Sequence, residues 1–220
     1  MIDQPGRVPP DDPRNITLTY RHDQSWRSGA DQEPDSWHVS AGVSGDSGTD
    51  AESHVGDMTI VVVDLYQTRD PFGLLDGEDA DLGAAAGTIF HARTGELDPD
   101  LDDLLEPIGD RILILNSVRL TPEWRGFGLG VLLAGTAIKK LSGGARAAVC
   151  SPAPISEPGD EEPDSAAERE QAIAALSRAW AQLGFEHFRD GVHVLDLSLV
   201  TLDESLRRLR TRAEQHRGPG

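Results

Sequence analysis

Apolar and polar residues alternate along the first part of the chain as they do in half-buried β-strands. Every second residue is apolar from Ile16 to Tyr20 and again from Trp37 to Val43. A stronger strand is expected from Met58 to Tyr66, which contains the run Ile60–Val63 with its isoleucine and valines. Residues 44–57, rich in Gly, Ser and Asp, predict a loop before it.

The acidic segment that follows is expected to be a loop, and the second half predicts alternating strands and helices. Thr68–Gly83 is interpreted as the loop, Ala84–Ala92 as a further strand and Leu101–Ile108 as a short helix. The later pattern predicts, in order, strand 111–120, helix 128–142, strand 146–151, helix 165–183, strand 192–199 and a last helix from Thr201.

A glycine-rich turn between a strand and a helix is the most informative local pattern. The apolar run Ile112–Leu120 predicts a buried strand, Thr121-Pro122 ends it, and three glycines open directly into the helical pattern that begins at Leu129. Glycines let the backbone approach a ligand closely, and the first N–H groups of a helix have no intrahelical partner. The arrangement therefore predicts a phosphate site. A dinucleotide-binding turn needs another glycine spacing and an acidic residue on the next strand, which Ala147–Cys150 lacks.

The hexapeptide Arg125-Gly126-Phe127-Gly128-Leu129-Gly130 resembles the acetyl-CoA-binding motif of the Gcn5-related N-acetyltransferases, the GNAT superfamily. That motif runs Arg or Gln, two residues, Gly, one residue, then Gly or Ala. A second stretch, Trp180–Phe185, is similar to the family's ending of an aromatic residue followed by Leu-Gly-Phe. The clear resemblance covers about residues 110–200.

The resemblance implies an α/β (α+β) domain with the GNAT fold: a mixed central sheet, flanking helices and a glycine turn after the fourth family strand. In that fold the strand before the turn diverges from the next one, and the pantetheine arm of acetyl-CoA, the acyl donor, lies in the split. The backbone of Val118, Arg119 and Leu120 is expected to bind that arm. The amides of Arg125, Gly126, Phe127, Gly128, Leu129 and Gly130 are expected to hold the pyrophosphate.

The catalytic residues are not identified by the resemblance. The family often has a tyrosine where this chain has Trp180, and indole cannot replace a phenol as an acid, so Trp180 is expected to form core or pocket wall. Some members carry a glutamate on the strand before the turn. Between Arg111 and Leu120 this chain has no carboxylate, and the neutral polar residues Asn116 and Ser117 are not bases near neutral pH.

Other reactive side chains have a simpler interpretation. Cys150 lies in an apolar strand and is expected to be a core residue rather than an acyl-carrying nucleophile. His187 and His193 can accept a proton at neutral pH, but they are expected to be turn or strand residues. Glu123, in the glycine turn, is expected to be exposed.

No metal site is expected. Asp98, Asp100 and Asp102 have the spacing of the first ligands of a calcium loop. Asp103 stands where that loop needs glycine, and Gly109 stands where it needs glutamate, so the match fails.

The acceptor side departs from the family, which usually has two helices between its first and second strands that shape the acceptor pocket. No helical pattern lies between Arg21 and Asp57, so the family's substrate preferences do not carry over. The acidic segment Glu157–Asp164 follows the second strand of the split, on the acceptor side in this fold. It either attracts a cationic amine or forms a solvated linker.

The net charge of −18 over 220 residues argues against nucleic-acid binding, because phosphates would be repelled. The single cysteine excludes an internal disulfide, and no apolar run suggests a membrane span or a signal segment. We expect a cytoplasmic protein with a flexible tail, 1–14, and one domain, 15–220.

Two functions fit these patterns. The first is an acyl-CoA-dependent N-acyltransferase that moves acetyl directly from acetyl-CoA to an amine. The alternative is a non-catalytic CoA-binding or protein-interaction module on the same fold. The intact glycine motif supports both, and the sequence specifies neither the acceptor nor the oligomeric state.

Overall fold

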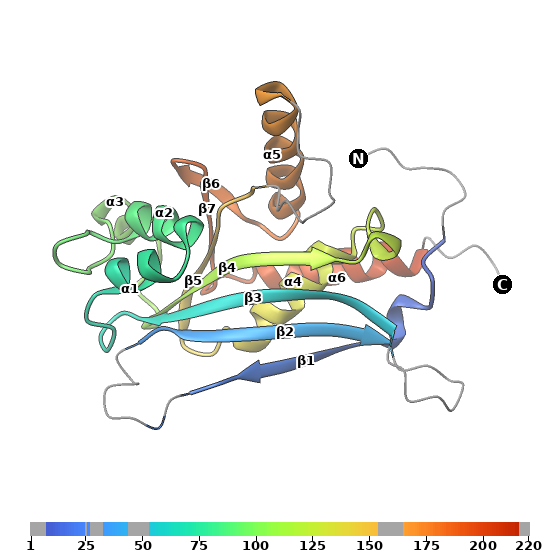
Figure 1. The fold of residues 1–220 in the computed structure, drawn as a ribbon, viewed down its shortest axis with the longest axis horizontal. Coiled ribbons are helices and arrows are strands. Elements are labelled where there is room, and N and C mark those ends of the chain that lie inside the picture. The colour runs from blue at the N-terminus through green and yellow to red at the C-terminus, as the bar shows by residue number, and fades with distance from the viewer. Residues whose placement is uncertain (1–7, 25, 27–32, 44–52, 154–164, 216–220) are drawn as a thin grey trace.

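One mixed β-sheet runs through the part of the chain that the computed structural model describes, residues 8–24, 26, 33–43, 53–153 and 165–215 (Figure 1). Its strand order is β1-β2-β3-β4-β5-β7-β6. The strands are β1 (Ile16–His22), β2 (Asp35–Val43), β3 (Ser53–Asp64), β4 (Arg111–Leu120), β5 (Ala145–Cys150), β6 (Glu186–Arg189) and β7 (Val192–Asp196).

The pairing is antiparallel everywhere except between β4 and β5, which are parallel. Parallel neighbours need a crossover, and the helix α4 (Leu129–Leu141) supplies it. The other helices are α1 (Pro71–Glu78), α2 (Ala80–Ile89), α3 (Pro99–Leu104), α5 (Ala166–Ala181) and α6 (Thr201–Gln215).

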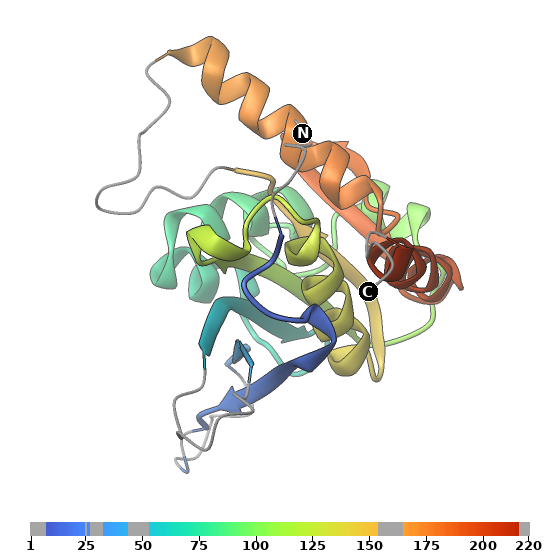
Figure 2. The same cartoon turned by 90° about the vertical axis from the view of Figure 1, so that its right-hand side faces the viewer.

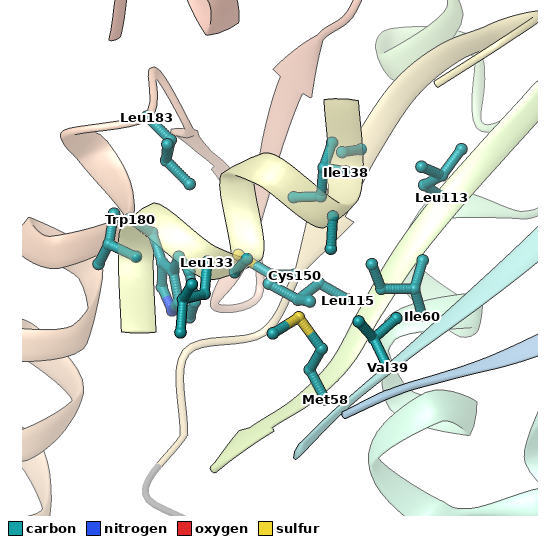
Figure 3. Close-up of a cluster of buried hydrophobic side chains, with 14 of the residues drawn as sticks. Val39, Met58, Ile60, Leu113, Leu115, Leu133, Ile138, Cys150, Trp180 and Leu183 are labelled. Atoms are coloured by element: carbon teal, nitrogen blue, oxygen red, sulfur yellow. The ribbon is translucent and has the colours of Figure 1, made fainter. Parts of the chain in front are cut away.

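Helices cover both faces of the sheet, so β3 and β4 are buried on both sides. On one face, α4 and α6 pack over Met58, Ile60 and Leu115, as Figure 3 shows for part of this cluster. On the other face, α1, α2 and α3 pack over Val61, Ile114 and their neighbours. Burial on both faces explains the continuous apolar runs of these strands, because neither side needs polar residues.

Helices α1, α2 and α3 all lie in the connection between β3 and β4, and we call residues 65–110 the β3–β4 insert. Two arginines from the far half of the sheet hold it. Arg146 of β5 is 7% exposed and donates to the carbonyl oxygens of Asp102, Leu105 and Glu106 at 3.0, 2.9 and 2.8 Å, and it also pairs with the Asp102 carboxylate. Arg189 of β6 pairs with Asp98 at 2.6 Å.

The insert is where the expected elements were wrong. Thr68–Gly83 is not a loop and Ala84–Ala92 is not a strand, because α1 and α2 occupy this region. The Asp79 carboxylate caps α2 by accepting from the backbone N–H groups of Asp81 and Leu82. The buried apolar side chains Leu82, Ala85, Ala86 and Ile89 of α2 have the spacing of one helix face.

Smaller differences concern element boundaries. The short helix expected at Leu101–Ile108 is α3, which ends at Leu104. β3 begins at Ser53, inside the loop expected at 44–57, of which residues 44–52 lie outside the described residues. β6 was not expected at all. In the predicted tail, residues 1–7 are likewise outside, and Pro13–Asn15 forms a short 3₁₀ helix capped by Asp12.

The remaining strands and the helices α4, α5 and α6 are confirmed within a few residues. The α/β class with a mixed sheet and flanking helices is therefore correct. Among the described residues, none of the helices combines the length and apolar character that crossing a bilayer requires.

Candidate functional site

The sheet opens between its two parallel strands. β4 and β5 are paired from Arg111 opposite Ala145 to Leu115 opposite Cys150. β5 ends there, whereas β4 continues to Leu120 beside β3. Among the residues that the structure describes, no strand pairs with the other edge of this last part of β4.

A β-bulge coincides with this opening. Thr59 of β3 pairs with Ser117 and the next residue, Ile60, pairs with Leu115, so Asn116 is an additional residue on β4. A bulge bends its strand and increases the local twist. β4 thus changes direction at the residue where its pairing with β5 stops.

The glycine turn follows the end of β4. Gly126 and Gly128 have φ angles of 89° and 73°, in the left-handed region that favours glycine. A Cβ built on Gly128 would meet no atom within 4 Å, so space remains beside the backbone at this point. Gly128 is the N-cap of α4 and has no side chain to cap the first N–H groups of that helix. A helix start of this kind is suited to bind an anion.

Arg125 has a structural contact in this turn. Its Nε–H donates to the carbonyl oxygen of Leu120 at 2.7 Å. This bond joins the glycine turn to the end of β4, across the short 3₁₀ helix Pro122–Trp124. Trp124, only 1% exposed, packs into the core and anchors the same turn there. Glu123 is exposed, as expected.

A cleft of about 760 Å³ lies at the opening of the sheet. It is lined by the end of β4, the glycine turn and the start of α4, and by residues of α2, α5 and the segment after β5. Of the nine residues expected to bind the donor, the cleft brings together Val118, Arg119, Leu120, Arg125, Gly126, Gly128, Leu129 and Gly130. Phe127 does not line it and instead packs, half-buried, against the core.

Cys150 and Trp180 both line this cleft and are both largely buried. Burial raises the pKa of the Cys150 thiol far above its ordinary value, which disfavours the thiolate that a nucleophile would need. Trp180 lies edge-on to Phe185, with the ring centroids 6.2 Å apart. Figure 3 shows both side chains among the apolar residues of the core, as the sequence led us to expect.

His187 and His193 lie outside the cleft lining. Their rings lie edge-on, with the ring centroids 5.2 Å apart, on the paired strands β6 and β7. His193 is buried, and its Nδ1 lies 3.0 Å from the carbonyl oxygen of Gly191. Burial is the main cause that lowers the pKa of His193.

The acidic side chains considered as metal ligands are engaged by arginines. Asp98 and Asp100 contact Arg189, and Asp102 contacts Arg146. Arg189 lowers the pKa of Asp98. Among the described residues, no cluster of three or more His, Cys, Asp or Glu side chains is arranged to hold a metal ion.

The sequence did not indicate that α2 and α5 line the cleft. Asp81, Leu82 and Ala85 come from α2, in a region expected to be loop and strand. From α5 come Ala172, Ala175, Leu176 and Ala179, which the sequence placed on a helix without indicating what they face. The acidic segment Glu157–Asp164, expected on the acceptor side, lies outside the described residues.

Comparison with family models, with curated proteins and with solved structures finds no match for this chain.

Proposed function

We propose that this chain is an acyl-CoA-dependent N-acyltransferase with the GNAT fold, which transfers acetyl from acetyl-CoA directly to an amine. The observation that carries the proposal is the coincidence of three features: the parting of β4 and β5, the glycine turn at the start of α4, and the cleft that joins them. The resemblance found in the sequence implies such a split for the pantetheine arm. The strands part after Leu115 and Cys150, directly beside the residues that carry the motif.

The donor would lie along the free edge of β4. Its pyrophosphate would accept hydrogen bonds from the first amides of α4, and its pantetheine amides would pair with the backbone of Val118–Leu120. This part of the site needs backbone groups more than side chains. The side walls of the cleft are largely apolar and include Leu129 of α4 and Leu176 of α5. They would exclude water from the thioester.

The acceptor side differs from the family pattern that the sequence resembles. Helix α2 beside the cleft belongs to the β3–β4 insert, whereas the family pattern has its acceptor-side helices between the first two strands. The acceptor pocket would therefore be formed by α2 and α5. The acceptor preference would then follow from the residues of these two helices and not from the family pattern.

A second function has one observation in its favour. Within the described residues, Asp81 is the only carboxylate that lines the cleft, no histidine lines it, and the thiol of Cys150 is held protonated. A non-catalytic CoA-binding module needs the donor site alone and would tolerate this shortage of proton-transfer groups. A transferase would have to move its protons through water.

Donor binding tests what both functions share. Replacing Gly128→Ala places a methyl group where backbone must approach phosphate, so we expect CoA affinity in calorimetry to fall by about tenfold or more, equivalent to about 1.4 kcal/mol. The control is Gly191→Ala in the β6–β7 turn. Gly191 has a similar φ of 79° and the same open surroundings, so the backbone strain is matched. Equal CoA affinities for the two variants would show that the glycine turn does not bind CoA.

Turnover separates the two functions. Thiol release from acetyl-CoA is followed with a panel of primary amines, including polyamines and peptide amino termini. Release well above spontaneous hydrolysis in the wild type supports the transferase. CoA binding that Gly128→Ala weakens, with no release on the whole panel, supports the binding module.

A further inference from the structure

We propose that Asp81 is a specificity-determining residue that selects acceptors with a second cationic group, so that the preferred substrates are diamines. This inference rests on the proposed N-acyltransferase function. It concerns the side of the cleft formed by α2, for which the sequence resemblance implies nothing.

The backbone of Asp81 is fixed by a hydrogen bond, and its carboxylate can bind a cation from the cleft. It lies in the first turn of α2, and its N–H donates to the Asp79 carboxylate at 2.7 Å. The cap and the burial of Leu82 and Ala85 fix this turn against the sheet. Within the described part of the chain, the exposed Asp81 carboxylate makes no ion pair and accepts no hydrogen bond.

The charges of the cleft differ between its two ends. Arg119 and Arg125 lie at the end of β4 and in the glycine turn, where the donor's phosphates are expected. Asp81 belongs to the opposite face of the sheet, because α2 packs over Ile114 and Val61 whereas α4 packs over Leu115. An acceptor that enters from the α2 side therefore meets a negative charge on a part of the cleft wall that Leu82, Ala85 and Ile114 also line.

The cation that Asp81 binds cannot be the nitrogen that reacts. A carboxylate stabilises the protonated form of an ammonium group, and only a neutral amine has the lone pair that attack requires. A diamine resolves this conflict, because one nitrogen is held as ammonium and the other reacts. The neutral nitrogen attacks the thioester carbon, the C–N bond forms, the C–S bond breaks, and CoA leaves as thiolate. The proton lost by the nitrogen passes through water to that thiolate.

The test compares cadaverine with pentylamine, and putrescine with butylamine, in the thiol-release assay. The wild type should have the lower KM for each diamine. Asp81→Asn should raise the diamine KM by about tenfold or more, as expected for the loss of one charge-assisted hydrogen bond, and raise the monoamine KM far less. The control is Asp76→Asn on α1, which removes the same charge from an exposed residue outside the cleft lining and should change neither KM.

Three outcomes would overturn the role of Asp81 while the transferase stands: no preference for diamines, an equal loss for diamine and monoamine in Asp81→Asn, or the same loss in Asp76→Asn. If CoA binds and no amine is acetylated, the transferase proposal fails by itself. Asp81 is then tested by calorimetry of cadaverine with the CoA-loaded protein. Loss of binding in Asp81→Asn but not in Asp76→Asn supports the role, and unchanged binding overturns it.

Discussion

His193 is a buried histidine whose proton affinity is altered by its position in the sheet. Burial, with a smaller contribution from His187, lowers the pKa of His193, and the hydrogen bond to the Gly191 carbonyl oxygen opposes this. The folded protein therefore binds a proton at His193 less readily than the unfolded chain does. A side chain of this kind makes the stability of the folded protein depend on pH.

We expect His193 to reduce stability as the pH falls. Between its lowered folded pKa and its unfolded value of about 6.5, the unfolded chain binds more protons, so the free energy of unfolding decreases on acidification in this window. Above it the imidazole is neutral in both states. In urea unfolding measured from about pH 7.5 to about pH 5, His193→Gln should lose less stability than the wild type. The same pH dependence in His193→Gln and wild type would contradict this, and His91→Gln, an exposed site, serves as control.

Helix α3 shows how one element depends on a side chain from another. Apart from Leu101 and Leu105, the segment presents mainly acidic and exposed residues, so little apolar burial holds it. The carbonyl oxygens of Asp102 in the helix, and of Leu105 and Glu106 directly after it, instead accept hydrogen bonds from the guanidinium group of Arg146. A guanidinium group can satisfy several acceptors in one plane, which an ammonium group cannot.

Arg146→Met should destabilise the protein by about 2–4 kcal/mol, because it leaves several carbonyl oxygens and the Asp102 carboxylate without their donor. Arg189→Met is the matched comparison. It removes the second arginine that holds the insert, but that side chain is 39% exposed, so solvent screens its ion pairs and the loss of stability should be clearly smaller. Urea unfolding of both variants checks the order. A loss from Arg189→Met as large as that from Arg146→Met would show that burial does not govern these contacts.

The elements that the sequence predicts well are those whose pattern is set locally. The glycine turn and the apolar strand β4 are continuous in sequence, and most of the expected donor residues line one cleft. Helix α2 was mistaken for a strand because its run of alanines ends in Thr88, Ile89 and Phe90, which favour strands. Its Asp79 cap and its packing over β3 and β4 decide otherwise. Asp81 lies in the segment that was expected to be a loop, and its place in the cleft depends on contacts distant in sequence.

At the scale of the whole molecule, the sheet consists of two antiparallel parts joined by one short parallel pair. β1, β2, β3 and β4 form the first part, and β5, β7 and β6 form the second. The β3–β4 insert, which starts and ends in the first part, is held by Arg146 and Arg189 of the second. Figures 1 and 2 show the ribbon of both parts from two sides. The candidate site is lined by residues of both parts, so both must be in place for it to exist.

The parting of β4 and β5 has a consequence for the exchange of amide hydrogens with solvent. Amides in a central strand are normally among the slowest to exchange, because strands on both sides hold them. The amides of Asn116–Leu120 that point away from β3 have no strand partner in the described part of the chain, so they should exchange rapidly although they belong to the middle of the sheet. Saturation with CoA should slow them selectively, while the amides of Val61–Val63 in β3 stay protected in both states. Slow exchange of every β4 amide in the free protein would mean that this edge is closed in solution.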